Sequence, residues 1–218
     1  MQLAGIQRQN ISEELADTIR QMIVEGEIAA GSRINEVHLA RDLGVSRTPL
    51  REAIARLVRE DTLILAPRVG TFVRPLTIEE FEQIYPIRAL LDPEALRLAG
   101  LPSPRQIDRL ERLNSRIDRA TDPNTIIASD DEWHLLLVSN CPNKVLIELI
   151  QQFMRRTRRY ELALMRERQQ VDVATDTHAQ IIAALRRGEL DTAAAILKSN
   201  LETGGEPIRR WLLEREDQ

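Results

Sequence analysis

Apolar residues recur at spacings of three and four along most of the chain, which is the period of an amphipathic helix. A clear example is the group Leu146, Leu149, Ile150 and Phe153. The period changes at Leu63–Pro75, where two short runs of strand-forming residues flank a Pro and Gly connection and predict one hairpin. The pattern therefore predicts a mainly α-helical chain with one small β-element in its first third.

Two helices are predicted ahead of a third, more basic one. The first spans Ile11–Val24, with an apolar face and Ser12 as its N-cap. Glycines then interrupt the pattern. The second helix spans Glu36–Leu43, and Gly44 supplies the left-handed residue that commonly ends a helix.

The third helix is predicted over Arg47–Glu60. Ser46 precedes it as a candidate N-cap, and Pro49 lies in its first turn, where a missing N–H group costs nothing. Two helices joined by a glycine turn and followed by a hairpin give the element order of a winged helix-turn-helix.

A domain boundary is predicted just after the hairpin. Thr77 is followed three residues later by Glu80, a capping-box pattern that starts a new helix. The 218 residues are enough for two domains. We expect a winged helix-turn-helix domain over residues 1–75 and an all-α helical bundle over residues 76–218.

Composition and charge refine this picture. The chain is 43% hydrophobic and 29% charged, which excludes collagen-like, low-complexity and largely disordered proteins. The net charge of −4 does not by itself indicate a nucleic-acid partner. The acidic excess lies in residues 76–218, however, and the third helix is locally basic, with Arg47, Arg51, Arg56 and Arg59 against Glu52 alone.

The start of the third helix has the chemistry of a DNA-reading element. Free N–H groups, the helix dipole and side chains all meet there, where a recognition helix faces the major groove. Arg51 suits a guanine edge, whereas Ser46 and Thr48 suit phosphate oxygens. The hairpin tip would enter the minor groove. The candidate DNA-contacting residues are Ser46, Arg47, Thr48, Arg51, Arg68 and Gly70. The alternative is a basic surface helix packed on a hairpin.

Other features bear on location. Cys141 is the single cysteine, so an intrachain disulfide is excluded. No leader-like segment opens the sequence, and no apolar run approaches the roughly 20 residues of a membrane span. The expectation is a cytoplasmic protein without a membrane partner.

A metal site is a second candidate. Asp130 and His134 lie four residues apart, on one face of a predicted helix, and His178 lies in another helix. One carboxylate and two imidazoles form an ordinary ligand set for Zn, Ni or Mn, with open positions for water or an anion. The alternative is a surface pair or a satisfied interior pair.

Several motifs resemble GntR-family transcriptional regulators. They are Leu43-Gly-Val-Ser-Arg-Thr-Pro-Leu-Arg-Glu-Ala53, Arg56-Leu57 and Arg68-Val-Gly-Thr-Phe-Val73. The segments Tyr85-Pro-Ile-Arg88 and Leu91-Asp-Pro-Glu-Ala-Leu-Arg-Leu-Ala99 are similar to the FadR-like branch with its helical FCD effector domain. The resemblance covers about residues 8–203. It implies a homodimer on a short palindromic DNA operator and a small organic acid as effector. The family's usual glycine after the recognition helix is Asp61 here.

The resemblance also bears on the effector site. In metal-containing FCD domains the pattern of Asp130, His134 and His178 is completed by a third histidine, and Asn200 stands at that position here. Asn200 either loosens the metal site or contacts the effector without a metal. The resemblance assigns Arg88 to the effector carboxylate, the alternative being an ion pair with Glu94 or another acid.

The arginine run at residues 155–159 has spacings that spread its members around a helix. We expect a solvated helix with one inward arginine, and Arg155 is assigned to the effector on that basis.

The sequence allows three alternative functions. The first is a ligand-responsive, sequence-specific transcriptional regulator, a repressor that is not an enzyme. The second is a metal-dependent hydrolase using Asp130, His134 and His178, although Glu132 lies about 200° from Asp130 around the helix and so makes a poor general base. The third is a nonspecific architectural DNA binder, which the modest net charge disfavours.

Overall fold

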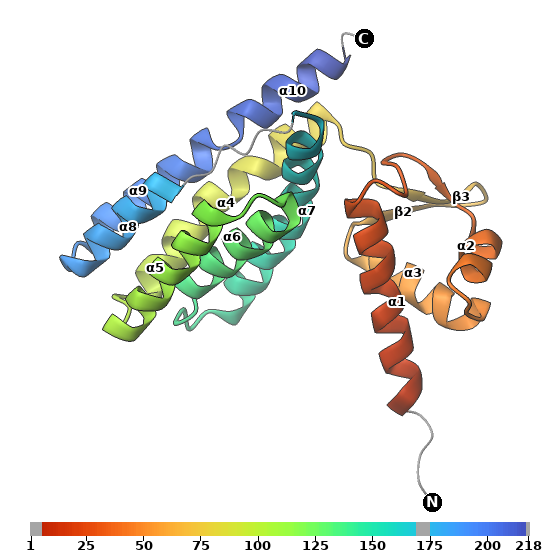
Figure 1. Ribbon diagram of the computed structural model, residues 1–218, viewed down its shortest axis with the longest axis horizontal. Coiled ribbons are helices and arrows are strands. Elements are labelled where there is room, and N and C mark those ends of the chain that lie inside the picture. The colour runs from red at the N-terminus through yellow and green to blue at the C-terminus, as the bar shows by residue number, and fades with distance from the viewer. Residues whose placement is uncertain (1–5, 169–174, 217–218) are drawn as a thin grey trace, which may run out of the picture. The chain divides into compact units, whose positions relative to one another are not determined.

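The computed structural model describes residues 6–168 and 175–216, apart from a few side chains near these ends and Val24. The chain divides into two compact units, Met1–Leu76 and Thr77–Gln218. The first unit combines helices with a small sheet, and the regular elements in the described part of the second unit are all helices (Figure 1). The boundary proposed from the sequence after Pro75 lies one residue from this division.

The first unit has the element order of a winged helix-turn-helix. Its elements are α1 (Ile6–Val24), β1 (Arg33–Ile34), α2 (Glu36–Asp42), α3 (Arg47–Arg59), β2 (Leu63–Ala66) and β3 (Gly70–Val73). The strands form an antiparallel sheet in the order β1-β3-β2. Helices α1 and α2 both pack on α3. The predicted hairpin is confirmed, with Leu63 opposite Val73 and Ala66 opposite Gly70.

The core of the first unit fixes the orientation of α3. Leu50, Ala53 and Leu57 are fully buried at spacings of three and four, and they pack with apolar residues of α1 and of the sheet. Because these positions form one face, Arg47 and Arg51 are left exposed on another face of the helix.

The first unit differs from the sequence-based picture in three local details. Helix α1 begins at Ile6, so Ser12 lies inside it rather than at its N-cap. Strand β1 was not predicted, because two residues are too short to show alternation. Ser46 does occupy the N-cap position of α3, but its side chain makes no capping hydrogen bond.

Two left-handed residues end the helices of the first unit as expected. Gly44 has φ +67° after α2, and Asp61 has φ +58° after α3. The left-handed conformation is unfavourable for a residue with a Cβ atom, so Asp61 needs stabilising contacts from other residues. Arg74 donates from Nε to the Asp61 carbonyl oxygen at 2.8 Å and from Nη2 to the Asp61 carboxylate at 2.7 Å.

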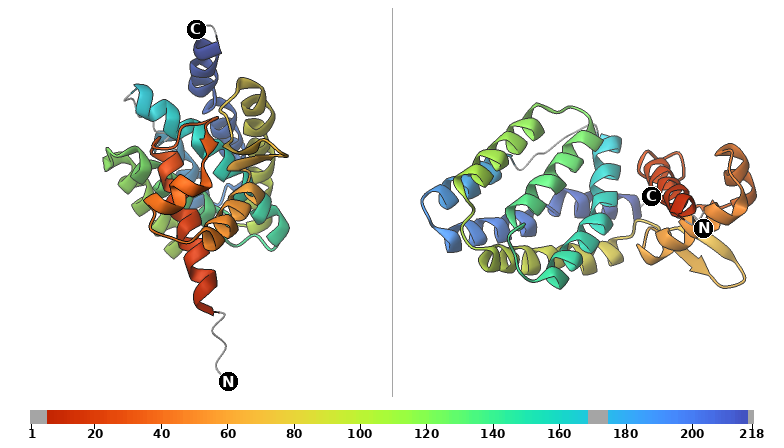
Figure 2. Two further views of the ribbon diagram at one scale, coloured as in Figure 1. Left: turned by 90° about the vertical axis from the view of Figure 1, so that its right-hand side faces the viewer. Right: turned by 90° about the horizontal axis from the view of Figure 1, so that it is seen from below.

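The second unit is a bundle of helices. Its described elements are α4 (Ile78–Ala99), α5 (Pro104–Arg119), α6 (Pro123–Leu137), α7 (Lys144–Arg168), α8 (Thr175–Arg186), α9 (Leu190–Thr203) and α10 (Glu206–Glu216). Helix α4 packs on α7 and α9, α5 on α6 and α8, and α8 on α9. Figure 2 shows these helices lying alongside one another. None of the helices in the described part of the chain has both the length and the apolar content of a membrane span.

The start of α4 departs from the predicted capping box. Thr77 accepts a hydrogen bond from the Glu80 backbone N–H, as expected. The Glu80 carboxylate instead accepts hydrogen bonds from Arg156, Arg159 and Tyr160 of α7, each at 2.8 Å. The acidic residue that the local pattern assigned to a cap therefore joins two helices.

Candidate functional site

The residues expected to contact DNA occupy the first turn of α3 and the hairpin tip. Ser46, Arg47, Thr48 and Arg51 are exposed. Arg51 donates from Nε to the Glu36 carboxylate of α2 at 2.8 Å. The guanidinium must leave or share this partner to reach a base edge.

The hairpin tip carries Arg68, which is exposed and has φ +64°. Gly70 follows with φ +140°, and a Cβ atom at this position would lie 2.8 Å from Nε of Arg33. The structure therefore supplies a reason for this glycine within the fold, since it makes room for a side chain of β1.

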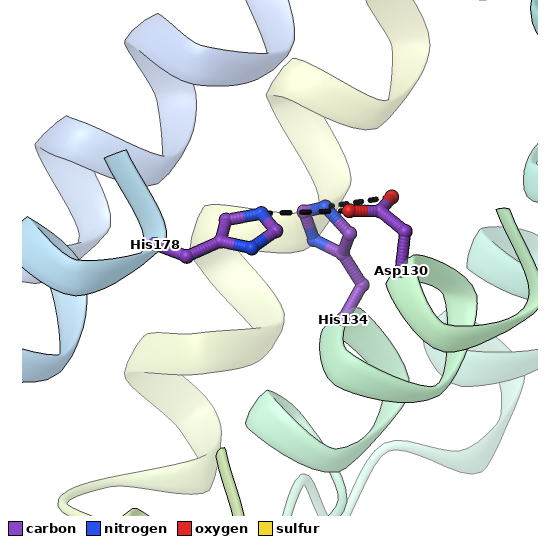
Figure 3. Close-up of side chains that lie close together, drawn as sticks. All are labelled: Asp130, His134 and His178. Atoms are coloured by element: carbon purple, nitrogen blue, oxygen red, sulfur yellow. Dashed lines mark ion pairs between the residues drawn. The ribbon is translucent and has the colours of Figure 1, made fainter. Parts of the chain in front are cut away.

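Asp130, His134 and His178 converge inside the second unit (Figure 3). Asp130 and His134 come from α6, and His178 comes from α8. The distances are 3.6 Å from His134 Nε2 to Asp130 Oδ2 and 3.6 Å from His178 Nε2 to Asp130 Oδ1. All three residues offer a ligand atom within 4.8 Å of the others. Ligands of a tetrahedral metal lie about 3.4 Å apart when each bond is about 2.1 Å, so the spacing suits a metal ion.

The surroundings of His178 set its tautomer. Asn114 on α5 donates from Nδ2 to the Thr175 carbonyl oxygen at 2.9 Å. Its Oδ1 therefore faces His178 Nδ1, at 3.2 Å, and accepts a hydrogen bond from it. This places the lone pair of His178 on Nε2, which is buried without a hydrogen-bond partner and lies on the side of Asp130. Trp133 stacks on the same ring, with centroids 3.8 Å apart.

Burial shapes the protonation of the three residues. It lowers the pKa of His178 to about 4, and it lowers the pKa of His134 well below the ordinary value, with Arg88 and His178 adding to the effect. Burial, followed by the charges of Glu161 and Asp131, raises the pKa of Asp130 to about 8. Both imidazoles are thus neutral at neutral pH, which is the form that binds a metal.

Asp130 and His134 line a cavity of about 510 Å³, and His178 lies behind them at 3.6 Å from Asp130. Arg88 and Asn200, both expected at the effector site, also line it. Other lining residues include Tyr85, Ile126, Ile127, Glu161, Leu164, Met165, Thr177, Thr203, Pro207, Ile208 and Arg210. The cavity combines an apolar wall with a few polar groups, as small-molecule sites do.

The expectation for Arg155 needs correction. Its side chain is exposed on α7 and is not part of the cavity lining. The inward arginines of this run are Arg156 and Arg159, which bind Glu80, and Arg158, which binds Asp131. The acidic residue Glu161, which sequence reasoning missed, is the charged residue of this part of α7 that reaches the cavity.

Arg88 takes part in a buried ion pair. Its Nη2 donates to Asp92 Oδ2 at 2.9 Å, one helical turn away, so the acid partner is Asp92 rather than Glu94. The Nε atom of Arg88 is buried without a hydrogen-bond partner. Arg88 is thus both paired and placed at the cavity wall.

Two neighbours of the candidate metal ligands have roles outside the cavity. Glu132 pairs with Arg109 at 3.1 Å and is not part of the cavity lining, as its helical angle predicted. Trp133 is fully buried, as expected for a core residue, but also stacks on a ligand candidate. Nothing in the spacing of Asn114, Tyr85 or Glu161 marked them beforehand, because each reaches the site through helix packing alone.

Comparison with known proteins gives two family matches. Residues 11–73 match the model of bacterial regulatory proteins of the gntR family, and residues 83–203 match the FCD domain. A relative named Nta operon transcriptional regulator, from Aminobacter aminovorans, is 30% identical over 83% of this chain and 86% of its own length. The putative L-lactate dehydrogenase operon regulatory protein of Escherichia coli is 27% identical over 92% and 87%. The probable D-xylose utilization operon transcriptional repressor of Paenarthrobacter nicotinovorans is 25% identical over 85% and 83%.

Solved structures share the fold. E. coli McbR/YncC has a TM-score of 0.75 at 22% identity, covering 92% of this chain and 98% of the other. A putative transcriptional regulator GntR from Rhodococcus has a TM-score of 0.74 at 21% identity, covering 93% and 97%.

Proposed function

Since the chain belongs to the gntR family of bacterial regulatory proteins and carries an FCD domain, we propose that it is a homodimeric repressor that senses a small organic acid through a divalent metal. Membership of the family and its relatives make the chain a ligand-responsive, DNA-binding transcriptional regulator and not an enzyme. The hydrolase alternative has no support from these relatives. The metal, the acid, the dimer and the operator are our proposals.

The observation that carries the metal proposal is the unpartnered Nε2 of His178, which lies 3.6 Å from Asp130 Oδ1. Buried polar atoms are normally hydrogen-bonded, so an orphaned lone pair next to a carboxylate calls for a cation. Two imidazoles and one carboxylate fit Zn, Ni or Mn. Asp130, His134 and His178 would hold the ion, and bound metal would supply a positively charged centre with open positions for an anion. Asn200 would contact the effector or the ion as a neutral donor.

The acid proposal rests on what surrounds that site. Arg88 lines the same cavity, and its planar fork suits a carboxylate. One relative is named for an L-lactate dehydrogenase operon and another for a D-xylose utilization operon. The relatives' names thus allow either an acid or a sugar, and the metal ligands and Arg88 favour the acid.

The DNA proposal places the first turn of α3 in the major groove. Arg47, Thr48 and Arg51 would contact bases and phosphates from this turn, and Ser46 would contact a phosphate. Arg68 would reach the minor groove from the hairpin tip, where Gly70 shapes the turn. A dimer would read two half-sites of a palindrome, and effector binding would change their spacing and hence the affinity.

The test is selection of the purified chain on random double-stranded oligonucleotides, followed by Arg51→Ala. We expect one palindromic sequence to be enriched, and the variant to lose about 1 to 3 kcal/mol of specific binding and to relax at one base pair of each half-site. Arg59→Ala is the matched control, because Arg59 is exposed at the other end of α3. Binding with a steep salt dependence but no preferred sequence would instead favour the architectural binder.

A further inference from the structure

Glu161 is a charged group of the cavity that the proposed function does not use. It lies on α7 and lines the cavity together with Asp130 and Arg88. Among the described residues it has no hydrogen bond and no ion pair. It also lies outside the group of donor atoms that approach one another within 4.8 Å at the metal site. The carboxylate of Glu161 would repel the carboxylate of an organic-acid effector in this cavity, so its presence there needs an explanation.

The charges around the cavity can be balanced group by group. Arg88 is paired with Asp92 at 2.9 Å, and Asp131 is paired with Arg158 at 3.1 Å. The histidines His134 and His178 add no charge, because an imidazole binds a metal ion in its neutral form. Arg210 lines the cavity but is exposed, so water screens its charge. Two carboxyl groups remain, those of Asp130 and Glu161, and with a metal bound both would be ionised, because a nearby cation favours the charged form.

A divalent metal at Asp130 would cancel both charges. The loaded cavity would then be close to neutral before any effector enters. A simple carboxylate would bring one uncompensated negative charge into this partly enclosed space, which is unfavourable. A ligand with one carboxylate and one ammonium group would bring none. Burial, assisted by the charge of Asp131, raises the pKa of Glu161 to about 7, so its carboxylate gains from a nearby cation.

From this balance we infer that the effector is an amino acid or a similar zwitterion, with Glu161 binding its ammonium group while the metal and Arg88 bind its carboxylate. This inference rests on the proposed function, because it uses the same cavity and the same metal. It makes Glu161 the residue that distinguishes amino acids from hydroxy acids and from plain acids.

The experiment uses the zinc-loaded full chain and matched pairs of ligands. The pairs are L-alanine with L-lactate, L-leucine with 2-hydroxyisocaproate, L-glutamate with 2-hydroxyglutarate, and L-phenylalanine with phenyllactate. Thermal shift and calorimetric titration give the affinities. We expect at least one amino acid to bind about tenfold or more tightly than its hydroxy partner, since the hydroxyl of the partner can donate to Glu161 but brings no positive charge to it. Tighter binding of the hydroxy acids, or no binding by any of the amino acids, would overturn the inference.

Glu161→Gln tests the assigned residue. We expect it to reduce the preference for the amino acid by about tenfold, with zinc still bound and with DNA binding in the absence of ligand unchanged. Glu132→Gln is the matched control, because Glu132 lies in the same unit but pairs with Arg109 outside the cavity. An equal loss of both ligands, or a large loss of zinc affinity, would contradict the role given to Glu161. Intact zinc and DNA binding alongside a preference for plain acids would leave the proposed function standing and refute this inference alone.

Discussion

At the scale of single residues, the structure shows how one departure from the family pattern is accommodated. Asp61 replaces the usual glycine after α3 and adopts φ +58°. Arg74 binds both its carbonyl oxygen and its carboxylate. The strained residue is thus tied to the end of β3, and the helix end keeps the geometry that a glycine would give.

The backbone strain at Asp61 can be isolated by comparing two variants. Asp61→Gly and Asp61→Ala both remove the carboxylate that Arg74 binds, but only the glycine adopts the left-handed region without strain. We expect the glycine variant to be more stable by about 1 kcal/mol. Hydrogen exchange of the buried α3 amides is the measurement, because it reports on the first unit alone. Equal protection in the two variants would show that Asp61 is not strained.

A second residue-scale prediction concerns the orientation of His178, one of the proposed metal ligands. Asn114→Ala removes the acceptor at 3.2 Å from His178 Nδ1, so the ring loses the contact that fixes its tautomer. We expect zinc affinity to fall about 10- to 100-fold, as for other contacts of this kind. Calorimetric titration of the full chain measures it. His38→Ala, which alters an exposed histidine of the first unit, serves as the control. Unchanged affinity in Asn114→Ala would mean that packing by Trp133 alone orients the ring.

These cases show what could be predicted from the sequence at this scale. The pair Asp130 and His134 was visible because helical periodicity places residues four apart on one face. His178 needed the family pattern, since nothing local connects it to α6. Asn114 and Glu161 were missed because tertiary packing alone brings α5 and α7 to the site.

At the scale of elements, periodicity predicted the helices better than their ends. The limits of α2 and α3 agree with the pattern to within a residue, because Gly44 and Pro49 mark them. Helix α1 begins earlier than Ser12 suggested. Strand β1 went unnoticed because its partner is β3, far along the chain. Where a boundary depends on neighbours rather than on local residues, sequence reasoning failed.

The junction of α4 and α7 yields a prediction about stability. Glu80→Ala would leave Arg156 and Arg159 without the carboxylate that binds both, and their side chains are 18% and 9% exposed. Removing one partner of a largely buried ion pair is costly, so we expect a loss of about 3 kcal/mol. Urea unfolding followed by fluorescence reports on it, since Trp133 and Trp211 both lie in the second unit.

The control for this junction is Glu132→Ala. Its exposed pair with Arg109 should contribute less than about 1 kcal/mol. If the two variants lose similar stability, the contact between Glu80 and α7 contributes no more than a surface ion pair.

At the scale of the whole molecule, the distribution of charge between the two units corresponds to their different proposed roles. The acidic excess belongs to residues 76–218, which contain the buried cavity, whereas the basic first turns of α3 belong to the first unit. A net charge of −4 therefore hides a surface suited to DNA. The total charge alone could not reveal the function, but its distribution along the chain could.

Ligand responsiveness requires that the two units influence each other, and linkage makes this measurable. If zinc at Asp130, His134 and His178 changes operator affinity by some factor, then operator DNA must change zinc affinity by the same factor. We expect a factor of about 5 to 150, which is the usual range of allosteric coupling. Fluorescence anisotropy of the selected operator with and without a chelator gives the first value, and zinc titration with and without the operator gives the second.

The variant Asp130→Asn is the control, and it should bind the operator with one affinity whether or not the chelator is present. If the chelator alters DNA binding of this variant as strongly as that of the parent, the coupling lies outside the metal site. If zinc does not change the operator affinity of the parent at all, the metal has a structural role and not a signalling one.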